Sequence, residues 1–124
     1  MKKIVLVIGF LGIFHTLIAQ ESKNIPATLN DCYLMLDSVL NNEQKNEIKN
    51  TNERDLIMYH RGLGMWIRNN FGLWSNRNVG IRALFIENNI LHPDSMSQLI
   101  IVGYFYYLNG INKSIEELIE LRYN

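Results

Sequence analysis

The chain has 124 residues, which is enough for one domain with its own hydrophobic core. Its formal charges cancel, with 12 Lys and Arg against 12 Asp and Glu. A chain without a basic excess lacks the field that attracts proteins to nucleic acid, so we expect no nucleic-acid partner. One cysteine in the chain excludes an intramolecular disulfide.

The start of the chain has the pattern of a secretory signal. Lys2 and Lys3 form a basic beginning, and the apolar run Ile4–Phe14 is shorter than the about 20 residues that a membrane-spanning helix needs. Ala19 is a small residue just before a plausible cleavage point. The alternative is an uncleaved anchor, but no basic flank follows the apolar run. We therefore predict a signal peptide over 1–19, a periplasmic or secreted protein, and membrane contact only during export.

A flexible lead-in is expected over 20–27, followed by a helical domain over 28–124. Thr28 and Asp31 have the spacing of a helix start, because their side chains can accept hydrogen bonds from free backbone N–H groups. Apolar residues then recur at helical spacing: Leu29, Cys32, Tyr33, Leu36 and Leu40. This predicts an amphipathic helix, in which Cys32 is a buried thiol rather than half of an interchain disulfide.

The next two helices are predicted to differ in length. A short surface helix is expected over Glu43–Lys49, with Ile48 as its one apolar anchor. A longer helix should begin at Asn52 and end at Gly72, a natural helix stop. One apolar stripe supports it: Leu56, His60, Leu63, Ile67 and Phe71.

The second half of the chain indicates three more helices. A short one is expected over Ile81–Asn89, with Leu84, Phe85 and Ile81 facing the core. The next should begin at Pro93, which suits the first helical position, and Leu99–Leu108 is so apolar that we expect burial on nearly every side.

A last amphipathic helix is indicated by four apolar residues near the end of the chain: Ile115, Leu118, Ile119 and Leu121. No alternating strand pattern occurs anywhere in the sequence. The expected fold class is therefore all-α, a single small domain of five or six short helices after the signal peptide.

Two motifs carry a resemblance to a known family. "YHRGLGMWIRNNFGLW", which ends at Trp74, and "ILHPDSMSQLII" resemble a family of small uncharacterised bacterial domains, common in Bacteroidota, with W-I-R-N and H-P-D-x-M-S motifs. The similarity runs from about Leu29 to Gly110 and implies no known activity. This chain departs from the pattern at Arg61, where an aromatic residue is common, and at Ser95, where a second aspartate is common. The matching positions are His60, Gly62, Gly64, Trp66, Arg68, Asn69, Trp74, His92, Pro93, Asp94, Met96 and Ser97.

The glycines and tryptophans of the first motif are most simply explained by packing. A glycine inside a helix costs about 1 kcal/mol relative to alanine, so Gly62 and Gly64 predict a neighbouring helix close to the bare backbone. Gly103, in the buried helix, is the expected partner. Trp66 and Trp74 are expected in the core, with an aromatic wall for a sugar or peptide as the alternative.

Arg68 has two interpretations. Its spacing from Arg54 and Arg61 predicts a solvated helix face, and a cation is favourable near the end of a helix. The alternative is a salt bridge with Asp94 or the capture of an anionic ligand, because a guanidinium presents a rigid set of donors.

The second motif fits the start of a helix, with Asp94 accepting from free N–H groups and His92 bonding locally. The functional alternative combines His60, His92 and Asp94 as an acid–base or metal set. Zinc needs about three protein ligands, and the histidines here lack the usual spacing, so we expect no metal and no cofactor. Ser95 and Ser97 near His92 are weak evidence for a nucleophile, because serine in the first turn commonly caps a helix.

These patterns favour a binding or interaction module over an enzyme, with an unknown protein or small ligand as its partner. The alternative is a small metal-independent hydrolase or anionic-ligand-binding protein that uses His60, Arg68, His92 and Asp94. Such an enzyme would need these four side chains to converge in one pocket. The candidate binding surface consists of His60, Trp66, Arg68, Asn69, Trp74, His92, Asp94 and Ser97.

Overall fold

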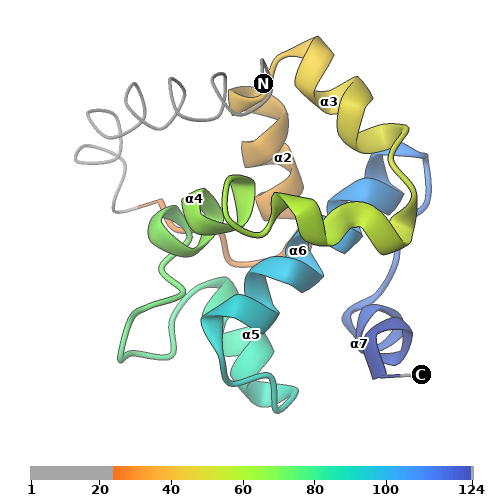
Figure 1. Cartoon of the computed structure of the whole chain (residues 1–124). Helices are drawn as coiled ribbons and strands as arrows, with labels where there is room; N and C mark the ends of the chain where they lie inside the picture. Colours follow the sequence, from red (N-terminus) through yellow and green to blue (C-terminus); the bar gives the residue numbers. More distant parts are fainter. Residues whose placement is uncertain (1–23, 124) are drawn as a thin grey trace.

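A computed structural model describes residues 24–123, so the predicted signal peptide lies outside the described residues (Figure 1). Within this part of the chain there are six α-helices, one 3-10 helix and no strand, which confirms the all-α class. In chain order the elements are α2 (Leu29–Val39), α3 (Asn42–Lys49), η1 (Glu53–Tyr59), α4 (Leu63–Asn70), α5 (Ile81–Glu87), α6 (Pro93–Leu108) and α7 (Ile115–Tyr123). None of these helices is long and apolar enough to cross a bilayer.

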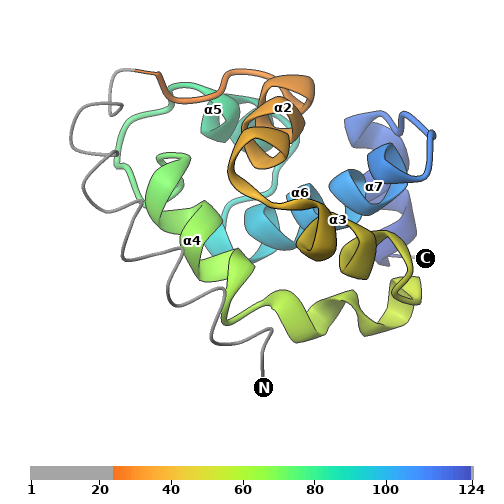
Figure 2. The same cartoon turned by 90° about the horizontal axis from the view of Figure 1, so that it is seen from above.

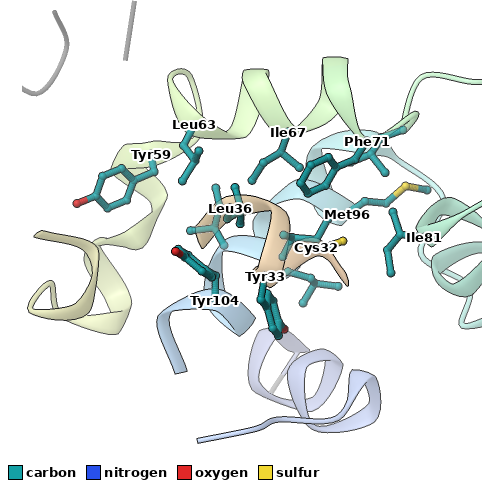
Figure 3. Close-up of a cluster of buried hydrophobic side chains, with 14 of the residues drawn as sticks. Cys32, Tyr33, Leu36, Tyr59, Leu63, Ile67, Phe71, Ile81, Met96 and Tyr104 are labelled. Carbon is teal, nitrogen blue, oxygen red and sulfur yellow. The ribbon is translucent and has the colours of Figure 1, made fainter. Parts of the chain in front are cut away.

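Helix α6 is the centre of the domain. It lies in the middle of both views, and α2, α3, η1, α4 and α7 all pack against it (Figures 1 and 2). The predicted burial on nearly every side is confirmed for Leu99–Ile101. The end of the helix, from Phe105 to Leu108, is only partly buried. Figure 3 shows the resulting core, in which Leu63 and Ile67 of α4 face Leu36 of α2.

The predicted start of α2 is confirmed. The Asp31 N–H donates to the Thr28 hydroxyl at 3.0 Å, and the Thr28 N–H donates to the Asp31 carboxylate at 3.2 Å. Each side chain thus satisfies a backbone donor that the first helical turn leaves free. Cys32, one residue further on, is a fully buried free thiol, as expected, and burial raises the pKa of this thiol.

The single long helix predicted from Asn52 to Gly72 is wrong. The chain instead forms η1, turns at His60–Gly62 and begins again as α4. Gly62 has φ −87° and ψ −88°, outside the helical region, and the His60 carbonyl accepts from Arg68 Nη2 at 3.2 Å. The guanidinium thus satisfies one carbonyl that the break would otherwise leave without a helical donor.

The expected contact between Gly64 and Gly103 is also wrong, although both glycines do allow close packing. A Cβ on Gly103 would collide with the hydroxyl of Tyr33, so this glycine makes room for a side chain of α2. A Cβ on Gly64 would lie 3.0 Å from Arg68 Nη1 and 3.7 Å from Ile101 Cδ1. Gly64 therefore makes room mainly for the guanidinium of its own helix.

The last residues of the predicted lead-in, Ile25 and Pro26, contact the loop before α5. The Pro26 carbonyl accepts from the Ile81 N–H at 2.7 Å, and Pro26 itself is buried. A Cβ on Gly80, which has φ +61°, would lie 2.7 Å from Ile25 Cγ2. Ile25 and Pro26 thus hold the loop before α5 against the domain.

The remaining helices agree with their patterns, with small differences. Ile48 is the one buried residue of α3, and Ile81 and Phe85 are buried in α5 while Leu84 is half-buried. In α7, Ile115 is buried but Leu121 is exposed. The apolar face of the last helix is therefore narrower than the sequence indicated.

Candidate functional site around Asp94

Arg68 is the buried centre of the two sequence motifs. Its side chain is only 6% exposed, and Nε lies 3.4 Å from Asp94 Oδ1. Nη1 donates to the Ser97 hydroxyl at 2.9 Å, and Nη2 donates to the His60 carbonyl. The prediction of a solvated face is wrong for Arg68, and the alternative of a salt bridge with Asp94 is confirmed. Each of the three nitrogens already has a partner inside the domain, and the side chain is only 6% exposed, so an external anion has little access to this guanidinium.

The start of α6 explains why the Asp94 carboxylate faces Arg68. His92 is the residue before the helix, and its Nδ1 accepts from the Asp94 N–H at 3.0 Å. The imidazole thereby performs the capping role expected of Asp94, while Pro93 occupies the first helical position as predicted. The Asp94 carboxylate is left to pair across to α4, and the Asp94 carbonyl accepts from the Ser97 hydroxyl at 3.1 Å.

Two imidazoles flank the outer oxygen of Asp94. Asp94 Oδ2 lies 4.0 Å from His60 Nε2 and 3.8 Å from His92 Nδ1. The Asp94 side chain is 47% exposed and that of His92 is 64% exposed. One carboxylate oxygen is thus held by the core through Arg68, and the other is available at the surface between the two histidines.

Trp74 extends this surface beyond His92. The indole is 57% exposed, its N–H donates to Asn69 Oδ1 at 3.1 Å, and its ring meets the His92 ring edge-on with centroids 6.4 Å apart. The placement of Trp74 in the core is therefore wrong, and the aromatic-surface alternative agrees with its position. We call the series His60, Asp94, His92 and Trp74, in which His60 is half-buried, the Trp74 strip.

The chain turn before Trp74 determines which of two neighbouring apolar side chains is exposed. Gly72 has φ +72°, which favours glycine, and directly after it Leu73 is fully buried while Trp74 points outward. Arg82 of α5 donates from Nη1 to the Leu73 carbonyl at 2.7 Å and so fixes the turn. Arg82 was not among the predicted site residues. The available signal was a charged residue within the apolar pattern of Ile81–Phe85.

Two of the candidate surface residues lie inside the domain. Trp66 is 1% exposed and packs edge-on against Phe71, with centroids 5.7 Å apart, which confirms its core assignment. Ser97 is fully buried between Arg68 and the Asp94 carbonyl. Neither side chain can contact a partner at the surface, whereas Asn69 is exposed and supports Trp74.

The geometry limits the chemistry of the site. The Ser97 hydroxyl donates to one partner and accepts from another, so it does not have the position of an activated nucleophile. Across residues 24–123, no three His, Cys, Asp or Glu side chains are grouped so as to hold a metal ion. The exposed groups can accept hydrogen bonds at Asp94 and His60 and can pack a planar or apolar group against the Trp74 indole.

Comparison of the chain with curated proteins and with solved structures found no match. Comparison with family models gave a match to residues 25–108, a span close to the one that the two motifs indicated. It includes the Trp74 strip and Arg68 and ends at the last residue of α6. The chain therefore belongs to the family described as "Domain of unknown function (DUF6794)".

Proposed function

We propose that this protein is an exported binding module, periplasmic or secreted, that contacts a partner protein through the Trp74 strip. The observation that carries the proposal is Trp74 itself, a large aromatic side chain that is 57% exposed yet fixed by Asn69 and His92. An exposed aromatic residue that is already ordered loses little side-chain entropy on binding. Tryptophan is also among the residues that most often dominate the binding energy of an interface.

Burial of Arg68 supports a surface whose shape is fixed before binding. The guanidinium joins α4, the turn after η1 and the start of α6, which are the elements that present His60, Asp94 and His92. A partner would therefore meet side chains that the core already orients. The signal pattern at the start of the sequence supports export, since its apolar run is too short for an ordinary span.

The enzyme and anionic-ligand alternatives receive less support. A hydrolase would need a nucleophile or an activated water beside the histidines, and Ser97 is buried with its hydroxyl engaged. Capture of an anion by Arg68 would require the anion to reach a guanidinium that is only 6% exposed and already in contact with Ser97, the His60 carbonyl and Asp94. Ser97 and Arg68, on which these alternatives depend, lie inside the domain, whereas Trp74 is already exposed.

The test is affinity capture from periplasmic extract with the mature chain, followed by mass spectrometry. We expect Trp74→Ala to lose proteins that the wild type captures. Met65→Ala is the matched control, because Met65 is an exposed apolar residue of α4 that lies outside the strip. Capture of the same proteins by all three forms would contradict the proposal.

A further inference from the structure

We infer that the partner presents an acidic segment to the Trp74 strip, and that Arg61 and Arg77 at the two ends of the strip receive its carboxylates. This inference rests on the proposed function and specifies the chemistry of the partner. Arg61 follows His60 directly in the sequence, and Arg77 lies three residues after Trp74. Both arginines are exposed.

The distribution of charge along the chain supports an acidic partner. From Leu56 to Ile86 the sequence contains four arginines and no lysine, aspartate or glutamate, although the whole chain is balanced. Positive charge is therefore concentrated between the end of η1 and the last turn of α5, a stretch that includes α4 and the Trp74 turn, whereas Glu53 and Asp55 of η1 and Glu87 of α5 lie just outside it. The compensating carboxylates lie elsewhere, for example at Glu116, Glu117 and Glu120 of α7.

The contacts within the fold divide the four arginines into two kinds. Arg68 is buried with Asp94, and Arg82 donates to the Leu73 carbonyl, so both have a structural role. Arg61 and Arg77 are different, because no carboxylate within residues 24–123 forms an ion pair with either of them. They are the guanidinium groups that remain available for an external carboxylate.

Asp94 does not cancel this positive potential. Its carboxylate is matched by Arg68, which lies within salt-bridge distance at its inner oxygen. The exposed charges that follow the strip residues His60 and Trp74 in the sequence are then those of Arg61 and Arg77. Complementary charge of this kind steers association and excludes partners of the wrong sign more than it adds affinity.

A protein segment fits these observations better than a membrane or a nucleic acid. Anionic membranes attract clusters of basic residues at about 1 kcal/mol for each Lys or Arg, and only two exposed arginines are present here. Single-stranded nucleic acids need a basic groove with several stacking aromatics, and the strip contains one tryptophan. A short acidic segment needs only a few groups: the Trp74 indole to contact one apolar side chain, and the guanidiniums of Arg61 and Arg77 to bind carboxylates.

The two tryptophans make the test direct. Each indole N–H gives its own proton–nitrogen NMR signal, so Trp74 reports on the strip and the buried Trp66 serves as an internal control. The mature protein is titrated with three synthetic peptides of equal length in which leucines alternate with glutamates, glutamines or lysines. The Trp74→Phe variant assigns the two signals.

We expect the glutamate peptide to shift the Trp74 signal while the Trp66 signal stays in place. The double variant Arg61→Gln/Arg77→Gln should bind it about twofold to thirtyfold more weakly, because exposed ion pairs contribute about 0.2–1 kcal/mol each. Arg54→Gln, an exposed arginine of η1 outside the strip, is the matched control and should leave the affinity unchanged. Raised salt should weaken binding by the wild type.

Equal binding of the glutamine peptide, stronger binding of the lysine peptide, or an unchanged affinity in the double variant would overturn the inference. The proposed function is tested separately, by the loss of captured proteins in the Trp74→Ala variant, so it can hold even if the acidic-partner inference fails. If that capture occurs but the glutamate peptide does not bind, the strip recognises a partner that is not acidic. An anionic oligonucleotide of equal charge that shifted Trp74 more than the glutamate peptide would also overturn the inference.

Discussion

Arg68 Nε lies 3.4 Å from Asp94 Oδ1, and this pair joins the end of α4 to the start of α6. The two partners differ in their surroundings, since Arg68 is 6% exposed and Asp94 is 47% exposed. A pair of this kind lies between an exposed ion pair, which contributes about 0–1 kcal/mol, and a buried one, whose disruption costs about 3–5 kcal/mol. The burial of Arg68 therefore decides how much the fold depends on the pair.

A double-mutant cycle with Arg68→Met and Asp94→Asn should reveal coupling. We expect an interaction energy of about 1–2 kcal/mol by urea unfolding, well above the roughly 0.5 kcal/mol within which independent sites add. Arg68→Met should be the more harmful single change, because it also removes the donors to Ser97 and the His60 carbonyl. An interaction energy below about 0.5 kcal/mol would place the two residues in separate roles.

Gly64→Ala should destabilise the protein even though alanine is the better helix former. The added Cβ would lie 3.0 Å from Arg68 Nη1 and 3.4 Å from the Tyr59 carbonyl, so the buried guanidinium would have to shift. In the Arg68→Met background the same change should cost less or become stabilising by up to about 1 kcal/mol, the propensity difference between the two residues. Urea midpoints of the four proteins measure this reversal, and equal effects in both backgrounds would contradict it.

Local patterns in the sequence predicted most of the fold. The features that they did not predict depend on contacts made only in the folded chain. The start of α2 depends on Thr28 and Asp31 alone, so the spacing of two residues was sufficient. The break between η1 and α4 involves the contact of the His60 carbonyl with Arg68, which a helical stripe does not reveal. Local pattern therefore predicted the starts of α2 and α6 but not the break before α4, which coincides with the hydrogen bond between Arg68 and the His60 carbonyl.

The candidate site also combines features that the sequence predicted with features that depend on the folded chain. The two motifs indicated that Arg68, His92 and Asp94 belong together, and the alternative of a salt bridge gave the correct pair. Sequence could not decide between Leu73 and Trp74 for the core, because both are apolar and adjacent. The positive φ of Gly72 and the Arg82 hydrogen bond, which are properties of the folded chain, made that choice.

Two buried tyrosines should respond in opposite ways to loss of their hydroxyls. Tyr33 and Tyr104 have ring centroids 6.0 Å apart, but the Tyr33 hydroxyl has no hydrogen-bond partner among residues 24–123, whereas the Tyr104 hydroxyl donates to Asp37 at 2.8 Å. Removing a buried polar group without a partner is neutral or stabilising, and removing one bonded to a carboxylate costs about 1.5–3 kcal/mol. We therefore expect Tyr33→Phe to keep or raise the free energy of unfolding at neutral pH and Tyr104→Phe to lower it.

Thermal and urea unfolding of both variants measure this difference. Tyr123→Phe, at an exposed position of α7, is the control for loss of a tyrosine hydroxyl as such. Equal destabilisation by Tyr33→Phe and Tyr104→Phe would show that the hydroxyl of Tyr33 has a partner in solution.

Tyr104 should also make the protein sensitive to alkaline pH. Burial, followed by the hydrogen bond to Asp37, raises the pKa of Tyr104 in the folded state. The folded state thus favours the neutral phenol, so the contribution of Tyr104 to stability is complete below the unfolded-state pKa of about 10. It is lost as the pH rises from there toward the folded-state pKa, at up to about 1.4 kcal/mol for each pH unit.

Urea unfolding of the wild type and Tyr104→Phe at pH 8, 9, 10 and 11 tests this dependence, with the pH values chosen to bracket the unfolded-state pKa of about 10. The wild type should be more stable at pH 8 and 9, and its advantage should shrink by about 1 kcal/mol between pH 10 and 11. Other groups that titrate in this range, such as Tyr33 and Cys32, are common to both proteins and cancel in the difference. A difference that stays constant from pH 8 to pH 11 would mean that Tyr104 ionises equally readily in the folded and unfolded chains. The hydrogen bond to Asp37 would then not stabilise the neutral phenol of Tyr104.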